Sequence, residues 1–128
     1  MKIFIAFSIT LFFFSHTVLA NNELEVTMKN MALSYKNTMQ AQDITAFTHH
    51  LNEFKTLVLE SKKVGFPTDK EAVSLEGIDK VIVLIEHAQT LATKGELTQA
   101  QLHLKAVDRL RKEYHKHHEP SFWQLIFG

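Results

Sequence analysis

Apolar residues recur every three or four positions from residue 24 onward, and no stretch alternates between apolar and polar residues as a strand would. This spacing places apolar side chains along one face of a helix. Four series of this kind follow one another, and each predicts the inner face of one helix. Their members are, in chain order, Leu24, Met28, Met31, Tyr35 and Met39; Phe47, Leu51, Phe54 and Val58; Leu75, Ile78, Ile82, Ile85, Leu91 and Ala92; and Ala100, Leu104, Val107, Arg111 and Tyr114.

Turn-forming residues separate the four series. Asp43 has a side chain suited to cap the start of the second helix. Gly65 and Pro67 end that helix, because glycine accepts a left-handed backbone conformation and proline cannot continue a helix. Gly95 predicts the end of the third helix for the same reason.

Two further pairs have the spacing of a capping box, in which a threonine and an acid or amide three residues later bond to each other's backbone amides. Thr68 and Glu71 form the first pair, and Thr98 and Gln101 form the second. We therefore predict that Thr68 caps the third helix and that Thr98 caps the fourth.

The turns between the predicted helices are short, and short connections make successive helices antiparallel neighbours. We therefore predict an all-α fold, namely an up-down-up-down antiparallel four-helix bundle with helices of about 20 residues, each about 30 Å long. In this arrangement the beginning of the first helix and the end of the fourth lie at the same end of the bundle.

The first residues of the chain have a different pattern. A basic start at Lys2 precedes an apolar run over residues 3–14, and the small residue Ala20 follows. This order predicts a secretory signal peptide over residues 1–20 with cleavage after Ala20. The apolar run is too short to span a membrane.

The predicted bundle then occupies residues 21–119, and residues 120–128 form a C-terminal tail. The tail is apolar from Phe122 to Phe127 apart from one glutamine, Gln124. We expect it to fold back over the end of the bundle, and a contact with a partner or a membrane surface is the alternative.

The amino-acid composition limits the kinds of binding and catalysis that the chain can support. The signal peptide removes one of 14 basic residues and none of 14 acidic ones, so the net charge of the remainder is near −1, and no basic stripe indicates nucleic-acid binding. The chain has no cysteine, which excludes disulfides, thiolate metal sites and covalent haem attachment through a C-x-x-C-H motif. Metal chemistry would therefore use His, Met, Asp or Glu. We find no nucleophile–base pair and expect no enzymatic activity.

Histidines gather near the end of the fourth predicted helix, at His115, His117 and His118. Histidine is the commonest metal-ligating side chain. The predicted topology brings Met28, in the early turns of the first helix, to the end of the bundle at which His115 lies, so a flat cofactor could lie between them. Taken alone, Met28 is more typical of core packing, and His115 of an ordinary helix end.

Four short motifs occur in order along the chain. They are Leu24-Glu25-x-x-Met28, Gly77-x-Asp79, Gly95-x-x-x-x-Ala100-Gln101 and Arg111-x-x-Tyr114-His115. Because of this set, the chain resembles the soluble periplasmic cytochrome b562 family over about residues 22–118.

The resemblance implies one non-covalent haem b per chain, with Met28 and His115 as the axial ligands of its iron. Met31 and Ile78 would line the haem. Arg111 would border it or contact a propionate, and a solvent-facing charge is the alternative. Methionine and histidine together suit low-spin haem iron and leave no open position for a substrate. The resemblance therefore implies a monomeric one-electron carrier in the periplasm, with a redox partner protein that the sequence does not name.

The chain departs from the family in the third helix, where Ser74 and Ile78 occupy positions at which the family tends to have aromatic rings. This departure and the added tail motivate an alternative, a haem-free four-helix bundle that binds a metal or a protein partner in the periplasm. In that alternative His115, His117 and His118 would bind copper or zinc.

The other histidines carry weaker predictions. His49 and His50 are adjacent in the sequence, and we expect them not to share a helix face, which argues against a metal site there. We expect His87 and His103 to be exposed.

Overall fold

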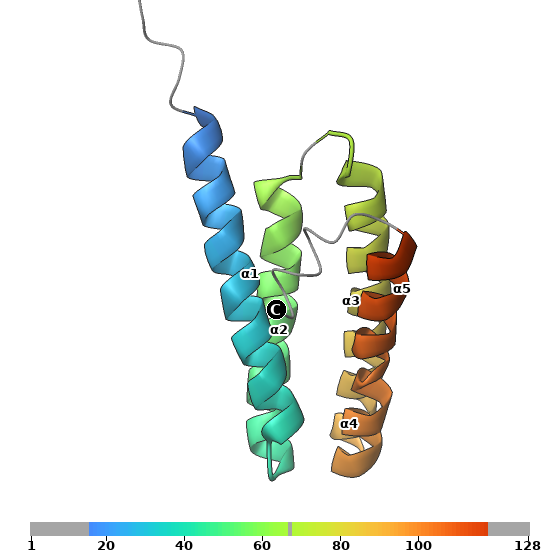
Figure 1. Ribbon diagram of the computed structural model, residues 1–128. Helices are drawn as coiled ribbons and strands as arrows, with labels where there is room; N and C mark the ends of the chain where they lie inside the picture. The colour runs from blue at the N-terminus through green and yellow to red at the C-terminus, as the bar shows by residue number, and fades with distance from the viewer. Residues whose placement is uncertain (1–15, 67, 118–128) are drawn as a thin grey trace, which may run out of the picture.

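The fold is all-α. A computed structural model describes residues 16–66 and 68–117, and this part of the chain contains five helical segments and no strand. They are α1 (His16–Gln40), α2 (Ile44–Val64), α3 (Glu71–Thr93), α4 (Leu97–Leu104) and α5 (Ala106–His117). The segments α4 and α5 follow each other along one rod, interrupted only at Lys105 (Figure 1). The predicted four-helix bundle is therefore confirmed, with its fourth helix divided in two.

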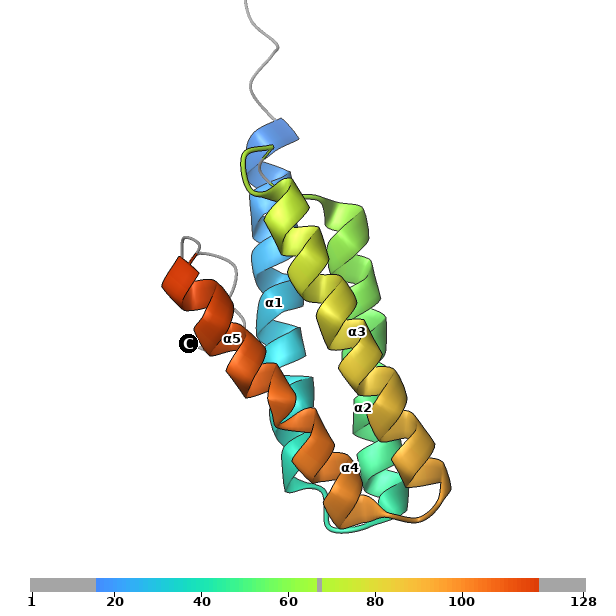
Figure 2. The ribbon, with the colours of Figure 1, turned by 90° about the vertical axis from the view of Figure 1, so that its right-hand side faces the viewer.

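The helices pack in the order in which they occur in the chain. α1 packs along α2, α2 along α3, and α3 along α4 and α5. α4 also closes the bundle against the C-terminal end of α1, whereas α5 leans away from α1 towards its own C-terminal end (Figure 2). Neighbouring helices are antiparallel, as short connections require.

Parts of the predicted domain boundaries lie outside the described residues. Residues 1–15 and the tail at 120–128 are not described, and the predicted cleavage site after Ala20 falls inside α1. The signal peptide and the tail therefore stay predictions. Within the described ranges, no helix combines the length and apolar character needed to cross a bilayer.

One apolar core runs through the bundle and takes residues from every helix. Its side chains with the least exposure and the largest volume are Phe47, Phe54, Met28, Met31, Leu51, Ile78, Ile85, Leu104 and Val107. Tyr35 and Val58 are also buried, and Met39 lies half-buried at the margin. The predicted inner faces of the first, second and fourth helices are thus confirmed wherever their side chains are described.

The predicted inner face of the third helix is partly wrong. Leu75, Ile82 and Leu91 are only half-buried. Ile78, Ile85 and Ala92 are buried as predicted. The other buried residues of α3 are small, namely Ser74, Gly77, Val81 and Ala88. α3 packs against α2 on one side and α4 and α5 on the other, so its apolar arc is wide and bulky residues at the edges of the arc do not mark its centre.

Local signals at two helix ends are confirmed. The Asp43 carboxylate accepts a hydrogen bond from the Ala46 amide at 2.8 Å and caps α2. The opposite end of α2 stops at Gly65, whose φ of +87° is a conformation that side chains disfavour.

The end of α3 forms a Schellman motif around Gly95, which has a φ of +75°. The Gly95 amide donates to the carbonyl of Ala92 at 2.9 Å, and the Glu96 amide donates to the carbonyl of Leu91 at 3.1 Å. These two bonds satisfy carbonyl groups that a helix end leaves without partners. The glycine predicted to end this helix is confirmed.

The capping box predicted at Thr68 is wrong. α3 begins at Glu71, after a turn, and the first bond of its backbone ladder runs from the Ser74 amide to the Lys70 carbonyl at 3.0 Å. Lys70 therefore occupies the N-cap position, and Thr68 lies two residues too early to cap the helix.

The second predicted capping box is also wrong, because Thr98 lies inside the first turn of α4. The Gln101 amide group instead reaches the end of another helix. Its Nε2 lies 3.4, 3.3 and 3.0 Å from the carbonyl oxygens of Thr38, Met39 and Ala41. Gln101 thus caps the C-terminus of α1 from α4 and joins the first and last helices of the bundle.

Replacing Gln101 by alanine should lower the free energy of unfolding by about 1 kcal/mol, because it removes the side-chain donor that Gln101 offers to the carbonyls of Met39 and Ala41. Urea unfolding followed by circular dichroism measures the change. Gln99→Ala is the matched control, since Gln99 is exposed on the same helix. Equal unfolding midpoints for the two variants would contradict the capping role.

Candidate functional site

The predicted site depends on the register between α1 and α5, and one hydrogen bond defines that register. The Tyr35 hydroxyl donates to Oδ2 of Asp108 at 3.3 Å. Met28 precedes Tyr35 by seven residues in α1, and His115 follows Asp108 by seven residues in α5. Seven residues are nearly two turns, or about 10 Å along the axis. The backbone positions of Met28 and His115 therefore lie at about the same height, on the helix faces that carry Tyr35 and Asp108.

α3 reaches the same end of the bundle. The rings of His87 and His103 stack with centroids 5.0 Å apart, which defines the height of α3 relative to the fourth helix. Ile78 precedes His87 by nine residues, and Lys112 follows His103 by nine residues. Ile78 therefore lies within about one turn of the height of His115.

Several described side chains near this end belong to the apolar core and are removed from water. Met28 is fully buried, and Met31, one turn further along α1, is 1% exposed. Ile78 on α3 and Val107 on α5 are buried in the same core. Ser74, which we identified as a departure from the family, is buried as well. The predicted lining residues Met31 and Ile78 thus lie in the core to which Met28 belongs.

The side chains of Arg111, Tyr114, His115 and His117 lie outside the described part of the structure, as does the whole of His118. For Arg111 and His115 the structure gives the position on α5 and nothing further. Their predicted roles toward a haem stay predictions.

Other residues of the four sequence motifs form ion pairs that stabilise the fold. Asp79 of the Gly77-x-Asp79 motif pairs with Lys62 of α2 at 2.7 Å and joins two helices. Glu25, three residues before Met28, pairs with Lys29 at 2.7 Å on the outer face of α1. The Lys29 ammonium donates a hydrogen bond to the Glu25 carboxylate and, with its charge, holds the pKa of that carboxyl below its usual value.

The predictions for His87 and His103 are partly confirmed. His87 is exposed, but His103 is only half-exposed because the two rings stack. The Nε2 atom of His103 is buried and has no hydrogen-bond partner among the described residues.

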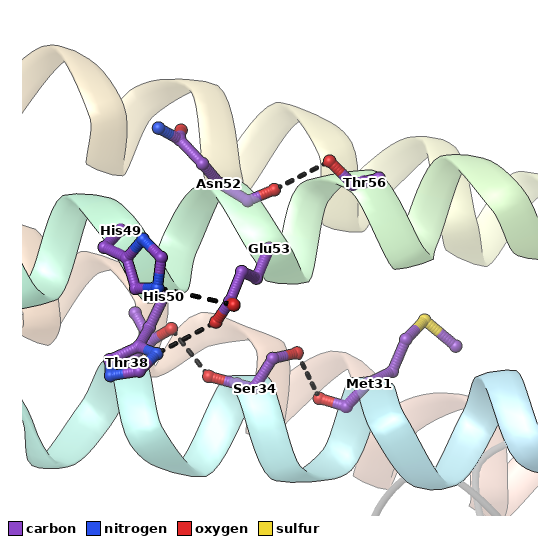
Figure 3. Close-up of polar contacts among 8 residues, drawn as sticks. All are labelled: Met31, Ser34, Thr38, His49, His50, Asn52, Glu53 and Thr56. Atoms are coloured by element: carbon purple, nitrogen blue, oxygen red, sulfur yellow. Dashed lines mark hydrogen bonds and ion pairs between the residues drawn. The ribbon is translucent and has the colours of Figure 1, made fainter.

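The expectation that His49 and His50 do not share a helix face is wrong. Both imidazoles contact one carboxylate, that of Glu53, on the face of α2 that borders α1 (Figure 3). His49 Nε2 lies 3.4 Å from Oε1 of Glu53, and His50 Nδ1 lies 3.0 Å from Oε2. The sequence contained the relevant signal, a glutamate four residues after one histidine and three after the other.

Comparison with known proteins agrees with this architecture. The sequence profile of a protein family described as Cytochrome b562 matches residues 23–119, which is most of the chain and runs from within α1 to beyond the end of α5. A search of curated proteins found no match.

Proposed function

The chain belongs to the cytochrome b562 family, and we propose from this premise that it is a periplasmic b-type cytochrome whose haem is held by Met28 and His115. The family consists of electron carriers rather than enzymes. The family match ends at residue 119 and so includes both proposed ligands.

The observation that carries the proposal is the register set by the bond between Tyr35 and Asp108. It supports a pair of ligands at one height on facing helices, because Met28 and His115 are each seven residues from that bond.

The chemistry of the donor set fits a haem. A thioether and a neutral imidazole are both ligands of low-spin haem iron. Bound haem would supply an iron centre that alternates between the ferrous and ferric states. Met28 has a buried sulfur position, and the apolar side chains of Met31 and Ile78 would keep water from the haem faces. If Met28 and His115 both held the iron, no position would be left for a substrate, which is consistent with electron transfer.

Met28→Ala tests the ligand on α1. The mature wild-type protein, titrated with haem, should show the sharp reduced-state visible bands of low-spin, six-coordinate iron. The Met28→Ala variant should bind haem with a high-spin spectrum, because one axial ligand is missing. Absorption spectroscopy of the reduced and oxidised forms measures the difference.

Met31→Ala is the control for this experiment. Met31 is as deeply buried as Met28 and lies one turn away on the same helix, so its loss should leave the iron low-spin. A low-spin spectrum in Met28→Ala, or a high-spin one in Met31→Ala, would contradict the assignment of Met28. A wild-type protein that is colourless and fails to take up haem would contradict the proposed function and support the haem-free alternative.

A further inference from the structure

We propose that His49, His50 and Glu53 form a surface binding site for a divalent transition-metal ion, which would bind Cu²⁺ more tightly than Zn²⁺. The three residues lie on α2, and neither proposed haem ligand belongs to them. Among the described residues, no other group of three histidines or acids brings its ligand atoms close enough together to hold one ion.

The geometry of a single helix explains the convergence. Successive residues of an α-helix are about 100° apart around its axis, so His49 and His50 by themselves diverge. Glu53 lies about 40° from His49 and about 60° from His50, between the two histidines and one turn further on. The Glu53 carboxylate can therefore contact the imidazole rings of both histidines, and the centroids of these two rings lie 5.2 Å apart.

The distances are close to those of a coordination sphere. Nitrogen and oxygen ligands at about 2.0–2.1 Å from a tetrahedral ion lie about 3.3 Å from one another. The two histidine–glutamate separations are 3.4 and 3.0 Å. One ligand atom from each of the three residues lies within 4.8 Å of the others. A small rotation of the exposed His49 ring would bring the separation between the ligand nitrogens of His49 and His50 to about 3.3 Å as well.

An ion would displace only weak interactions. The present contacts join the Glu53 carboxylate to two imidazoles on the protein surface, where such pairs contribute little to stability. The side chains of His49 and Glu53 are 68% and 49% exposed, so an ion can reach them directly from water. All three ligands are held on one helix, which reduces the loss of conformational freedom on binding.

The remaining coordination positions face a groove between α1 and α2. Its volume is about 680 Å³, and its polar lining on α1 includes Asn30 and Asn37. The hydroxyls of Ser34 and Thr38 donate to the carbonyls of Met31 and Ser34 within α1 (Figure 3), and neutral hydroxyl oxygens are not among the usual ligands of Zn²⁺ or Cu²⁺. We therefore assign the remaining positions to water.

The ligand set selects the class of ion. Two imidazole nitrogens and one carboxylate oxygen suit Zn²⁺ and Cu²⁺, and affinities for such sites rise from Mn²⁺ to Cu²⁺ and fall at Zn²⁺. Mg²⁺ and Ca²⁺ prefer oxygen ligands throughout and should not bind here.

Isothermal titration calorimetry of the mature full-length protein with Zn²⁺, and separately with Cu²⁺, tests the site. We expect binding of one ion per chain, tighter for Cu²⁺, and no heat of binding with Mg²⁺. His50→Ala and Glu53→Gln should each weaken Zn²⁺ binding by at least about tenfold, since even the outer-shell partners of metal ligands have effects of this size. Circular dichroism should show that both variants keep the helical content of the wild type.

Matched histidine variants separate this site from others in the chain. His87→Ala removes an exposed histidine of α3 and should leave Zn²⁺ affinity unchanged. The double variant His117→Ala/His118→Ala should also retain it. The proposal is overturned if the double variant His49→Ala/His50→Ala binds Zn²⁺ as the wild type does, or if the affinity is lost with His117 and His118 instead.

Discussion

Replacement of His115 by alanine should weaken haem binding by at least about a hundredfold, which is the largest functional effect that we expect of a single substitution. The imidazole is the stronger of the two proposed axial ligands, and even residues that only support a metal ligand cost up to about a hundredfold when they are replaced. Haem titration followed by visible absorption, compared with the wild-type protein, measures the affinity directly.

His117→Ala is the matched control. Position 117 lies about 200° around α5 from position 115, so the two positions fall on opposite sides of the helix. His117→Ala should therefore bind haem with wild-type affinity and keep the low-spin spectrum. Retention of haem by His115→Ala, or its loss from His117→Ala, would show that another residue provides the ligand on the fourth helix.

The largest expected effect on stability comes from Leu51 in the second helix. Leu51 is fully buried in the core, and alanine at this position leaves a cavity that the surrounding helices fill only in part. Leu51→Ala should lower the free energy of unfolding by about 3 kcal/mol. Urea unfolding followed by circular dichroism, with haem at the same concentration for every variant, measures the difference.

Leu59→Ala provides the comparison on the same helix with the same change of side chain. Leu59 is 41% exposed, so its replacement removes less contact area and creates no enclosed cavity. Its cost should stay below about 1 kcal/mol. Similar costs at the two positions would mean that the second helix does not face the core as described.

The positions that form the core could be predicted well where each helix has one dominant neighbouring face. Met28, Tyr35, Phe47 and Leu51 were all expected inside and are buried. α3 is the exception, because its buried stripe turns small residues such as Ala88 inward and leaves bulky residues such as Leu75 and Leu91 at its edges. The size of an apolar side chain is then a poor guide to the direction in which it points.

Some helix ends could also be predicted from the sequence and others could not. Asp43 and Gly95 act through bonds to residues a few positions away, so a local motif was sufficient to predict both. Gln101 has the spacing of a local cap but binds carbonyls that precede it by 60 to 63 residues. A motif cannot distinguish these outcomes, because the distant carbonyls are brought near Gln101 only when the fourth helix packs against the first.

The expectation that His49 and His50 do not share a helix face was wrong for a different reason. His49, His50 and Glu53 belong to one helix, and the geometry of that helix was sufficient to bring them together. The prediction considered only the angle between the two histidines. A carboxylate at the intermediate angle, one turn further along, joins both rings.

The sequence by itself determined the helices, their antiparallel order and most of the residues that face inward, because these depend on spacing within single helices and on short turns. It also pointed to Met28 and His115 as partners through the motifs of a family. Only the tertiary structure decided the relative heights of the helices, through contacts such as that of Tyr35 with Asp108. Residues 73 positions apart have no local constraint on their register, so their alignment follows from the packing of the complete bundle.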